Sequence, residues 1–144
     1  MSLTCNFRRL APTQSPDDFS LLDSIFSLRA EAHKASGRVP PWINRKHELW
    51  NDEHDDHACH FVVESGKGLL AAARLCTHNC INNLPEGYFY QAVGVDPHPL
   101  IACMSRLVVH PDAQGQGLAK TLDLARLAEA KKLQCSSLVG YTPS

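Results

Sequence analysis

Residues 101–133 read IACMSRLVVH PDAQGQGLAK TLDLARLAEA KKL, and they carry three structural signals in succession. Residues 101–109 are rich in apolar and β-branched side chains, which predicts a buried strand. A turn over residues 110–112 and a small-residue loop over residues 114–117 follow the strand. Leucine and alanine then recur at helical spacing as far as Leu133, which predicts an amphipathic helix.

A glycine loop that opens a helix is a suitable place for a bound anion. The first N–H groups of a helix have no partner within the helix, and the helix dipole is positive at that end. Glycine lets the main chain approach an anion because no Cβ stands in the way. A plain glycine turn that starts a buried helix would give the same pattern. The order of strand, turn, loop and helix favours a site for a phosphate-containing ligand.

The rest of the chain alternates expected strands with expected helices. Ser15-Pro16 is a typical helix start and Gly37 a typical stop. We expect an α/β or α+β fold, a mixed and mostly antiparallel sheet flanked by helices, in one domain over residues 1–144. The expected strands cover residues 4–10, 59–64, 69–76, 88–95, 101–109 and 136–141, and the expected helices cover residues 16–36, 43–50 and 118–133.

Polarity predicts which side chains face solvent. The segment over residues 51–57 reads NDEHDDH and is expected at the surface. In the helix over residues 118–133, an apolar stripe is expected to face the core, with charged residues outside. The stripe comprises Leu118, Leu122, Leu124, Ala125, Leu127 and Ala128, and the outward set comprises Lys120, Asp123, Arg126, Glu129, Lys131 and Lys132.

The composition is that of an ordinary globular protein. The chain has 144 residues, 44% of them hydrophobic, and a formal net charge of −1, so no basic field indicates a nucleic-acid partner. No apolar run approaches the roughly 20 residues needed to span a bilayer, and the N-terminus lacks the apolar core of a secretory signal. We therefore expect a cytoplasmic protein whose six cysteines are reduced.

Two groups of potential metal ligands occur in the sequence. One gathers histidines, Cys59 and acids over residues 52–60, and the other is Cys76-x-His78-x-Cys80. Neither has the paired Cys-x-x-Cys spacing of a zinc knuckle. A solvated acidic loop and a strand end account for both groups, so no metal site is predicted. A small metal-binding module stays the alternative.

The segment over residues 107–119 resembles the GNAT acyltransferase superfamily. The family signature is Gln or Arg, two residues, Gly, one residue, and Gly or Ala, which Gln114, Gly117 and Ala119 match. Here, as in the family, the signature opens a helix after a strand that ends in a Val-x-Pro-like turn. The resemblance implies a GNAT-like fold. A looser likeness, to the acyl-homoserine-lactone synthase and N-acyl-amino-acid synthase branches, lies over residues 52–63 and 105–107.

The resemblance also implies an acyl donor and a place for it. Acetyl-CoA or another acyl-CoA would lay its pyrophosphate on the main-chain amides of the loop. Its pantetheine arm would follow the exposed edge of the preceding strand, as an added strand does. The strand over residues 136–141 would diverge from that edge and open a groove. By position, the cofactor-binding residues are Leu107, Val108, Val109, Gln114, Gly115, Gln116, Gly117, Leu118, Ala119 and Lys120.

Acyl transfer to an amine needs a base, a polarised thioester carbonyl and a proton for the leaving thiolate. Many family members carry a glutamate base where this chain has Cys103, eleven residues before Gln114. A thiol is a poor base unless its pKa is lowered, and strand packing is the alternative role of Cys103. Tyr141 is the candidate proton donor, again with strand packing as the alternative. Ser105 is a further candidate, and Arg106 is expected to pair with an acid.

The resemblance implies a small-molecule or protein amine as acceptor, with no nucleic acid or membrane as partner. The family fold usually continues with a further helix and hairpin, and without them the strand over residues 136–141 would be an open edge. Either the chain is truncated or a second subunit covers this edge, and we expect a homo-oligomer or a naturally degraded open reading frame. The alternative to an N-acyltransferase is a catalytically inactive, coenzyme A-binding or structural GNAT-like protein.

Overall fold

The computed structural model describes residues 6–11, 16–37 and 51–140, and the structural statements below concern these ranges. The expected helix over residues 43–50 and the candidate Tyr141 lie outside them. No helix within the described ranges is long and apolar enough to cross a bilayer. The elements are β1 Asn6–Leu10, α1 Pro16–Ser36, β2 Cys59–Ser65, β3 Gly68–His78, the 3₁₀ turn η1 Ile81–Asn83, α2 Gly87–Ala92, β4 Ile101–Val109, the 3₁₀ turn η2 Pro111–Ala113, α3 Leu118–Lys132 and β5 Ser137–Gly140.

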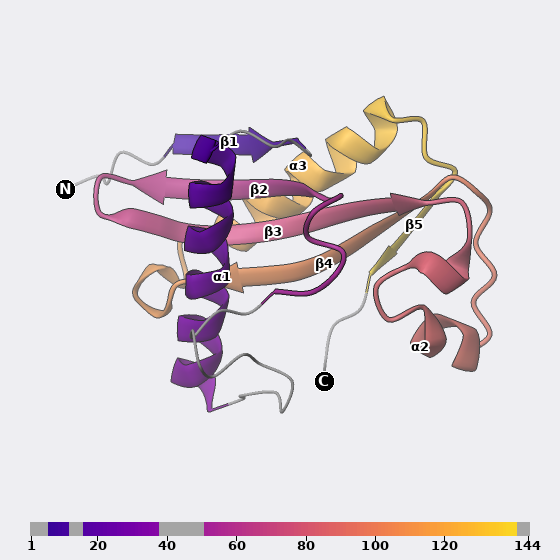
Figure 1. Cartoon of the computed structure of the whole chain (residues 1–144), viewed down its shortest axis with the longest axis horizontal. Helices are drawn as coiled ribbons and strands as arrows, with labels where there is room; N and C mark the ends of the chain where they lie inside the picture. The colour runs from indigo at the N-terminus through magenta and orange to yellow at the C-terminus, as the bar shows by residue number, and fades with distance from the viewer. Residues whose placement is uncertain (1–5, 12–15, 38–50, 141–144) are drawn as a thin grey trace.

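The strands form one five-stranded sheet in the order β1-β2-β3-β4-β5. Neighbours from β1 to β4 are antiparallel, and β5 runs parallel to β4. Helix α1 crosses one face of this sheet, α3 covers the opposite face, and α2 lies near β5 (Figure 1). The expectation of a mixed, mostly antiparallel sheet flanked by helices is confirmed.

Helix α1 buries one apolar face against the sheet. Leu22, Ile25 and Phe26 pack there in one cluster with Val62 of β2. Gly37 follows the helix with a φ of 73°, a left-handed conformation that ends helices and that glycine adopts without strain. The helix expected over residues 16–36 is confirmed.

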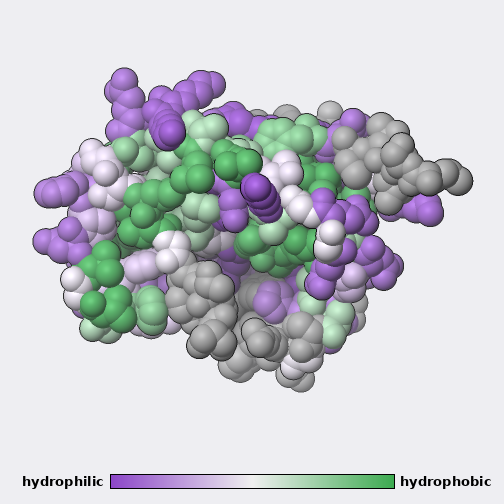
Figure 2. All heavy atoms as spheres, turned by 180° about the vertical axis from the view of Figure 1, so that it is seen from behind, coloured by the Kyte–Doolittle hydropathy of each residue, from purple (hydrophilic) through white to green (hydrophobic). Residues whose placement is uncertain are grey.

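Helix α3 packs on the other face with only part of its expected stripe. Leu118 and Leu122 are buried against Phe61 of β2. Leu124 and Leu127 are 57% and 38% exposed and Ala128 is exposed as well, so their expected place in the core stripe is wrong. Figure 2, which views the molecule from the side of α3, shows apolar side chains at this surface.

Two charged residues of α3 that were expected to face outward are buried. Glu129 is 6% exposed and accepts a hydrogen bond from Arg9 Nε of β1 at 3.0 Å. Arg126 is 2% exposed and reaches the sheet as well. Charge favours a solvent-exposed position, but a charged side chain can enter a helix–sheet layer when the sheet supplies its partners.

The strand expected over residues 88–95 is wrong, because Gly87–Ala92 forms helix α2. Its Tyr90 is buried in an apolar cluster with Cys103 of β4. At Gly87, an ideal Cβ would stand 2.2 Å from the carbonyl oxygen of Ile81, so glycine permits this close packing on η1. The aromatic residues here favour a strand by propensity, but such propensity gives way to packing against the neighbouring elements.

Candidate functional site

The turn after β4 is held by a short network of hydrogen bonds. The His110 N–H donates to the carbonyl oxygen of Leu70 at 2.7 Å, which ties the turn to β3. The Asp112 N–H donates to His110 Nδ1 at 3.1 Å, and the Ala113 N–H donates to the His110 carbonyl at 2.9 Å. Since Ala113 is also buried, the loop that follows starts from a fixed point.

The glycine loop leaves the first amides of α3 open. Gly115 and Gly117 have φ values of 81° and 76°, and Gly117 is the N-cap residue of α3 without a side-chain cap. The first N–H groups of a helix have no partner in it, and here the first helical bond runs from Thr121 N–H to the Gly117 carbonyl. An ideal Cβ at either glycine meets nothing within 4 Å, so the space beside the loop is open. This geometry fits a phosphate group.

Strand β4 has an edge that β5 leaves uncovered. Pairing between these strands runs from Ile101–Ser137 to Met104–Gly140 and goes no further within the described ranges. Along the remaining part of β4, Leu107 is 40% exposed, whereas Val108 is buried at 7%. The uncovered edge of β4 thus leads into the turn and the glycine loop that follow it in the chain.

A β-bulge interrupts β4 within this uncovered part. Ala72 lies opposite Val108 and Arg74 lies opposite Ser105, so Arg106 and Leu107 together face a single residue of β3. Arg106 has a φ of 53°, in the left-handed region that side chains other than glycine rarely adopt. Bulges bend a strand and redirect its groups, so this one shapes the uncovered edge of β4.

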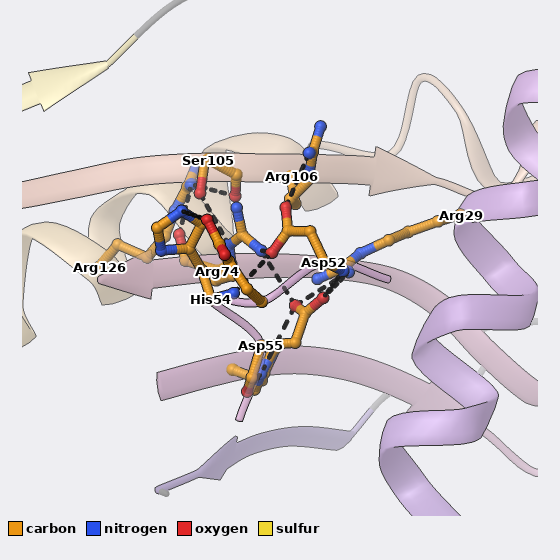
Figure 3. A network of polar contacts seen from close by, with 10 residues as sticks. Arg29, Asp52, His54, Asp55, Arg74, Ser105, Arg106 and Arg126 are labelled. Carbon is orange, nitrogen blue, oxygen red and sulfur yellow. Dashed lines mark hydrogen bonds and ion pairs between the residues drawn. The ribbon is translucent and has the colours of Figure 1, made fainter. Parts of the chain in front are cut away.

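Beside the bulge lies a cluster of three arginines and two aspartates, here called the arginine–aspartate cluster: Arg29, Asp52, Asp55, Arg74 and Arg106 (Figure 3). Arg29 Nη1 donates to Asp55 Oδ1 and Oδ2 at 3.0 and 3.1 Å. Arg74 Nη1 donates to Asp52 Oδ1 at 2.6 Å and to Asp55 Oδ1 at 3.1 Å. Arg106 Nη2 donates to Asp52 Oδ2 at 2.8 Å. The cluster joins α1, β3 and β4 through the segment before β2.

The expected surface position of residues 51–57 is therefore wrong at Asp55, which is 2% exposed. Polar composition predicts exposure only where the fold offers no buried partner, and here α1 and β3 supply the guanidinium groups of Arg29 and Arg74. The expected pairing of Arg106 with an acid is confirmed by its bond to Asp52.

The local environment sets the protonation of Asp52, and of His60 beside the cluster, at neutral pH. Burial acts to raise the pKa of the Asp52 carboxyl, but the charge and hydrogen bonds of Arg74 and Arg106 outweigh it and hold that pKa well below its usual range. Burial lowers the pKa of His60, whose Nε2 lies 2.9 Å from the carbonyl oxygen of Asp55. Asp52 is therefore an ionised partner of arginines, and His60 is a neutral donor.

The two described catalytic candidates differ in what they can do. Cys103 is 1% exposed, its Sγ lies 3.9 Å from Tyr90 Oη, and burial raises the pKa of the thiol. A buried thiol that keeps its proton is a poor base. Ser105 Oγ accepts a hydrogen bond from Arg74 Nε at 3.0 Å, which leaves its own proton available for donation.

The described cysteines and acids offer no metal site. Among the described residues, no group of three or more His, Cys, Asp or Glu side chains is placed to hold a metal ion. The described cysteines, which are Cys59, Cys76, Cys80, Cys103 and Cys135, are free thiols.

Sequence reasoning missed Arg126 and Asp55 as structural partners of this region. Arg126 follows Leu118 and Leu122 at steps of four residues, so the helical period does place it on the buried face. Arg126 was nevertheless expected to face outward, because the residue is charged. No local pattern distinguishes Asp55 from the neighbouring acids, because its partners come from distant parts of the chain.

The profile of the Acetyltransferase (GNAT) family matches residues 22–142. The chain belongs to this family. The match spans the loop, the bulged strand and the arginine–aspartate cluster. No curated protein matches the chain by sequence.

Solved structures share the fold at low sequence identity. An aminoglycoside N-acetyltransferase, AAC(6')-Iy in complex with CoA, superposes with a TM-score of 0.63 at 13% identity, over 99% of this chain and 80% of that one. A predicted acetyltransferase with acetyl-CoA from Clostridium acetobutylicum gives 0.62 at 17% identity, over 98% and 82%. A ribosomal-protein-alanine N-acetyltransferase from Brucella melitensis gives 0.56 at 19%, over 97% and 81%.

These comparisons correct one expectation from the sequence. The narrower likeness to acyl-homoserine-lactone synthases and N-acyl-amino-acid synthases is not supported, because the matching family profile and these structures are those of acetyltransferases. The short segments that suggested it contribute to the arginine–aspartate cluster, through Asp52, Asp55 and Arg106.

Proposed function

We propose that this chain is an N-acyltransferase that moves an acyl group, most simply acetyl, from acyl-CoA directly to an amine. The observation that carries the proposal is the pair of adjoining features at this place. The first main-chain amides of α3 are open, and the edge of β4 before them is bulged and uncovered by β5. Family membership and the CoA and acetyl-CoA complexes of two structural neighbours support this donor.

The loop would hold the pyrophosphate of the donor through main-chain amides. These belong to the segment from Gln114 to Ala119, with the exposed Lys120 adding positive charge in the first turn of α3. The edge of β4 from Leu107 to Val109 would bind the peptide-like pantetheine arm through its main chain. Val108 would contribute through its backbone, because its side chain is buried in the core.

The chemistry needs few side chains once the donor is bound. An acceptor amine that arrives unprotonated attacks the thioester carbonyl, and the leaving thiolate needs a proton. Tyr141 stays our proposed proton donor, since it directly follows Gly140, which pairs with Met104 where β5 leaves β4. Ser105 is proposed as a hydrogen-bond donor to bound ligands. Cys103 is assigned a packing role in this proposal, because its thiol is buried and protonated.

Isothermal titration calorimetry with acetyl-CoA and CoA tests the cofactor site. Gly117→Glu places a negative side chain at a left-handed residue of the loop and is expected to weaken binding about tenfold or more, which corresponds to ~1.4 kcal/mol. Gly94→Glu is the matched control, because Gly94 also has open space and a φ of 79°. Binding that Gly117→Glu leaves as tight as in wild type would remove the loop from the proposal.

Turnover separates the enzyme from its alternative, a catalytically inactive CoA-binding protein. Thiol release from acetyl-CoA is measured with a panel of small amines and peptide amino groups. Release above the rate without amine supports an N-acyltransferase, and its amine dependence identifies the acceptor class. Binding of acetyl-CoA without any such release would favour the alternative.

We also propose that a second copy of the chain covers the outer edge of β5. Within the described ranges β5 pairs only with β4, and Leu138 of β5 is 40% exposed. Leu124 and Leu127 of α3 are exposed as well. Light scattering on the purified chain tests the oligomer, and a monomer at all concentrations would contradict it. The single domain over residues 1–144 and the cytoplasmic location stay predictions.

A further inference from the structure

Arg126 is a buried arginine whose contacts lie next to the bulge of β4. It is 2% exposed, and its guanidinium reaches from α3 to the sheet (Figure 3). Nη1 donates to the carbonyl oxygens of Arg74 and Ser105, at 3.3 and 3.4 Å. Nη2 donates to Asp123, one turn earlier on α3. A single helix residue thus bridges two strands where their register is irregular.

The Ser105 carbonyl immediately precedes the strained residue of the bulge. Arg106 has a φ of 53°, and such a conformation costs a residue other than glycine about 1–2 kcal/mol. It persists only where the surroundings fix it. Arg126 holds the carbonyl before this residue, and Asp52 holds its side chain. The bulge is therefore fixed by contacts from α3 and from the arginine–aspartate cluster.

Core packing alone does not explain an arginine at this position. Its Nε is buried without a hydrogen-bond partner among the described residues. Such burial is unfavourable, and an apolar side chain on the face of Leu118 and Leu122 would avoid it. Unlike an apolar residue, this arginine donates hydrogen bonds to the two strand carbonyls.

The orientation of the held peptide determines what the edge of β4 presents. A trans peptide directs its carbonyl and its N–H to opposite sides. The Ser105 carbonyl accepts from Arg126 of α3, so the Arg106 N–H at the other end of that peptide points away from this guanidinium. Pairing with β5 has already ended there, at Met104–Gly140.

We propose that Arg126 is a positioning residue for the acyl donor, because it fixes the main chain of β4 at the bulge and thereby the edge along which the pantetheine arm lies. The inference rests on the proposed function. Arg126 also belongs to the helix whose first turn forms the phosphate site, so it links the two halves of the site within one rigid element.

Two probes measured by calorimetry separate the strand edge from the loop. Acetyl-CoA spans both, whereas ADP carries the pyrophosphate without pantetheine or acyl group. Arg126→Lys keeps the positive charge, but its single nitrogen cannot replace the fork that bridges both carbonyls and Asp123. The expected result is an acetyl-CoA affinity about fivefold weaker, the loss of about one hydrogen bond, with the ADP affinity unchanged.

Two further variants keep the test decisive if Arg126→Lys folds poorly. Asp123→Asn removes the negative charge that pairs with Nη2, at a side chain that is 45% exposed, and it is expected to shift the acetyl-CoA to ADP ratio in the same direction by less. Glu129→Gln is the matched control, since it breaks a buried ion pair of the same helix with Arg9 of β1. It is expected to leave the ratio unchanged.

The outcomes distinguish the proposed function from the positioning role of Arg126. Wild-type protein that binds neither probe would overturn the proposed function and this inference with it. Binding of both probes, with a ratio that Arg126→Lys and Asp123→Asn leave unchanged, would overturn only the positioning role. A ratio shift of equal size in Glu129→Gln would likewise reduce Arg126 to a general structural contact.

Discussion

Replacing Asp55 by asparagine removes one negative charge from the centre of the arginine–aspartate cluster. The Asp55 carboxylate accepts from Arg29 Nη1 at 3.0 and 3.1 Å, from Arg74 Nη1 at 3.1 Å and from the Asp52 N–H at 2.8 Å. Asparagine keeps the shape but has one acceptor oxygen. In either orientation its NH₂ group faces at least one of these donors.

The expected loss follows from the burial of all three charges. Side-chain exposure is 1% for Arg29, 1% for Asp55 and 0% for Arg74, so solvent replaces none of the lost interactions. Breaking one partner of a buried pair typically costs about 3–5 kcal/mol, because a guanidinium stays buried without its counter-ion. Against a typical total of about 5–15 kcal/mol, Asp55→Asn is expected to remove a large share of the stability.

Urea unfolding followed by circular dichroism measures this loss. Glu64→Gln is the control, because its ion pair with Arg8 is exposed, with side-chain exposures of 52% for Arg8 and 27% for Glu64. Such a pair contributes about 0–1 kcal/mol. A loss in Asp55→Asn no larger than that in Glu64→Gln would refute the reasoning that the cluster stabilises the fold through buried charge pairing.

Three other predictions follow from single contacts. The free energy of unfolding is expected to fall as the pH drops from about 7 to about 5, because burial lowers the pKa of His60 and the unfolded chain takes up the proton first. His60→Gln should flatten this slope in urea titrations, and an unchanged slope would speak against it. Gly87→Ala is expected to cost about 1–3 kcal/mol, since its Cβ would stand 2.2 Å from the Ile81 carbonyl oxygen; an unchanged urea midpoint would count against that contact. Cys103→Ala should leave the rate of acyl transfer unchanged, with Cys76→Ala as control from the same apolar cluster. A rate loss confined to Cys103→Ala would assign the thiol a catalytic role.

Local patterns were sufficient for the elements that build the proposed donor site. The strand over residues 101–109 and the loop with Gly115 and Gly117 are where the sequence places them. The β-branched residues and the glycines act through their own backbone preferences, so their effect is readable without knowledge of the partners. The same holds for α1, whose start at Pro16 and stop at Gly37 were expected.

The predictions from sequence that are wrong concern places where residues far apart in the chain meet. A helix over Gly87–Ala92 replaces the strand expected over residues 88–95, because Tyr90 packs on β4 and Gly87 on η1. The α3 stripe differs from the expected one because the sheet offers carbonyl oxygens to Arg126. Helical period and polarity describe one element at a time, so they cannot indicate a partner on another element.

The local sequence was enough to predict a strand, a glycine loop and a helix, since each depends on neighbouring residues and on the conformations that glycine permits. It gave no sign of the bulge at Arg106 or of the burial of Asp55. Those features exist because Arg29, Asp52, Arg74 and Arg126 come together from separate elements. A strained residue and a buried charge are stable only where such distant groups supply their hydrogen bonds and counter-charges.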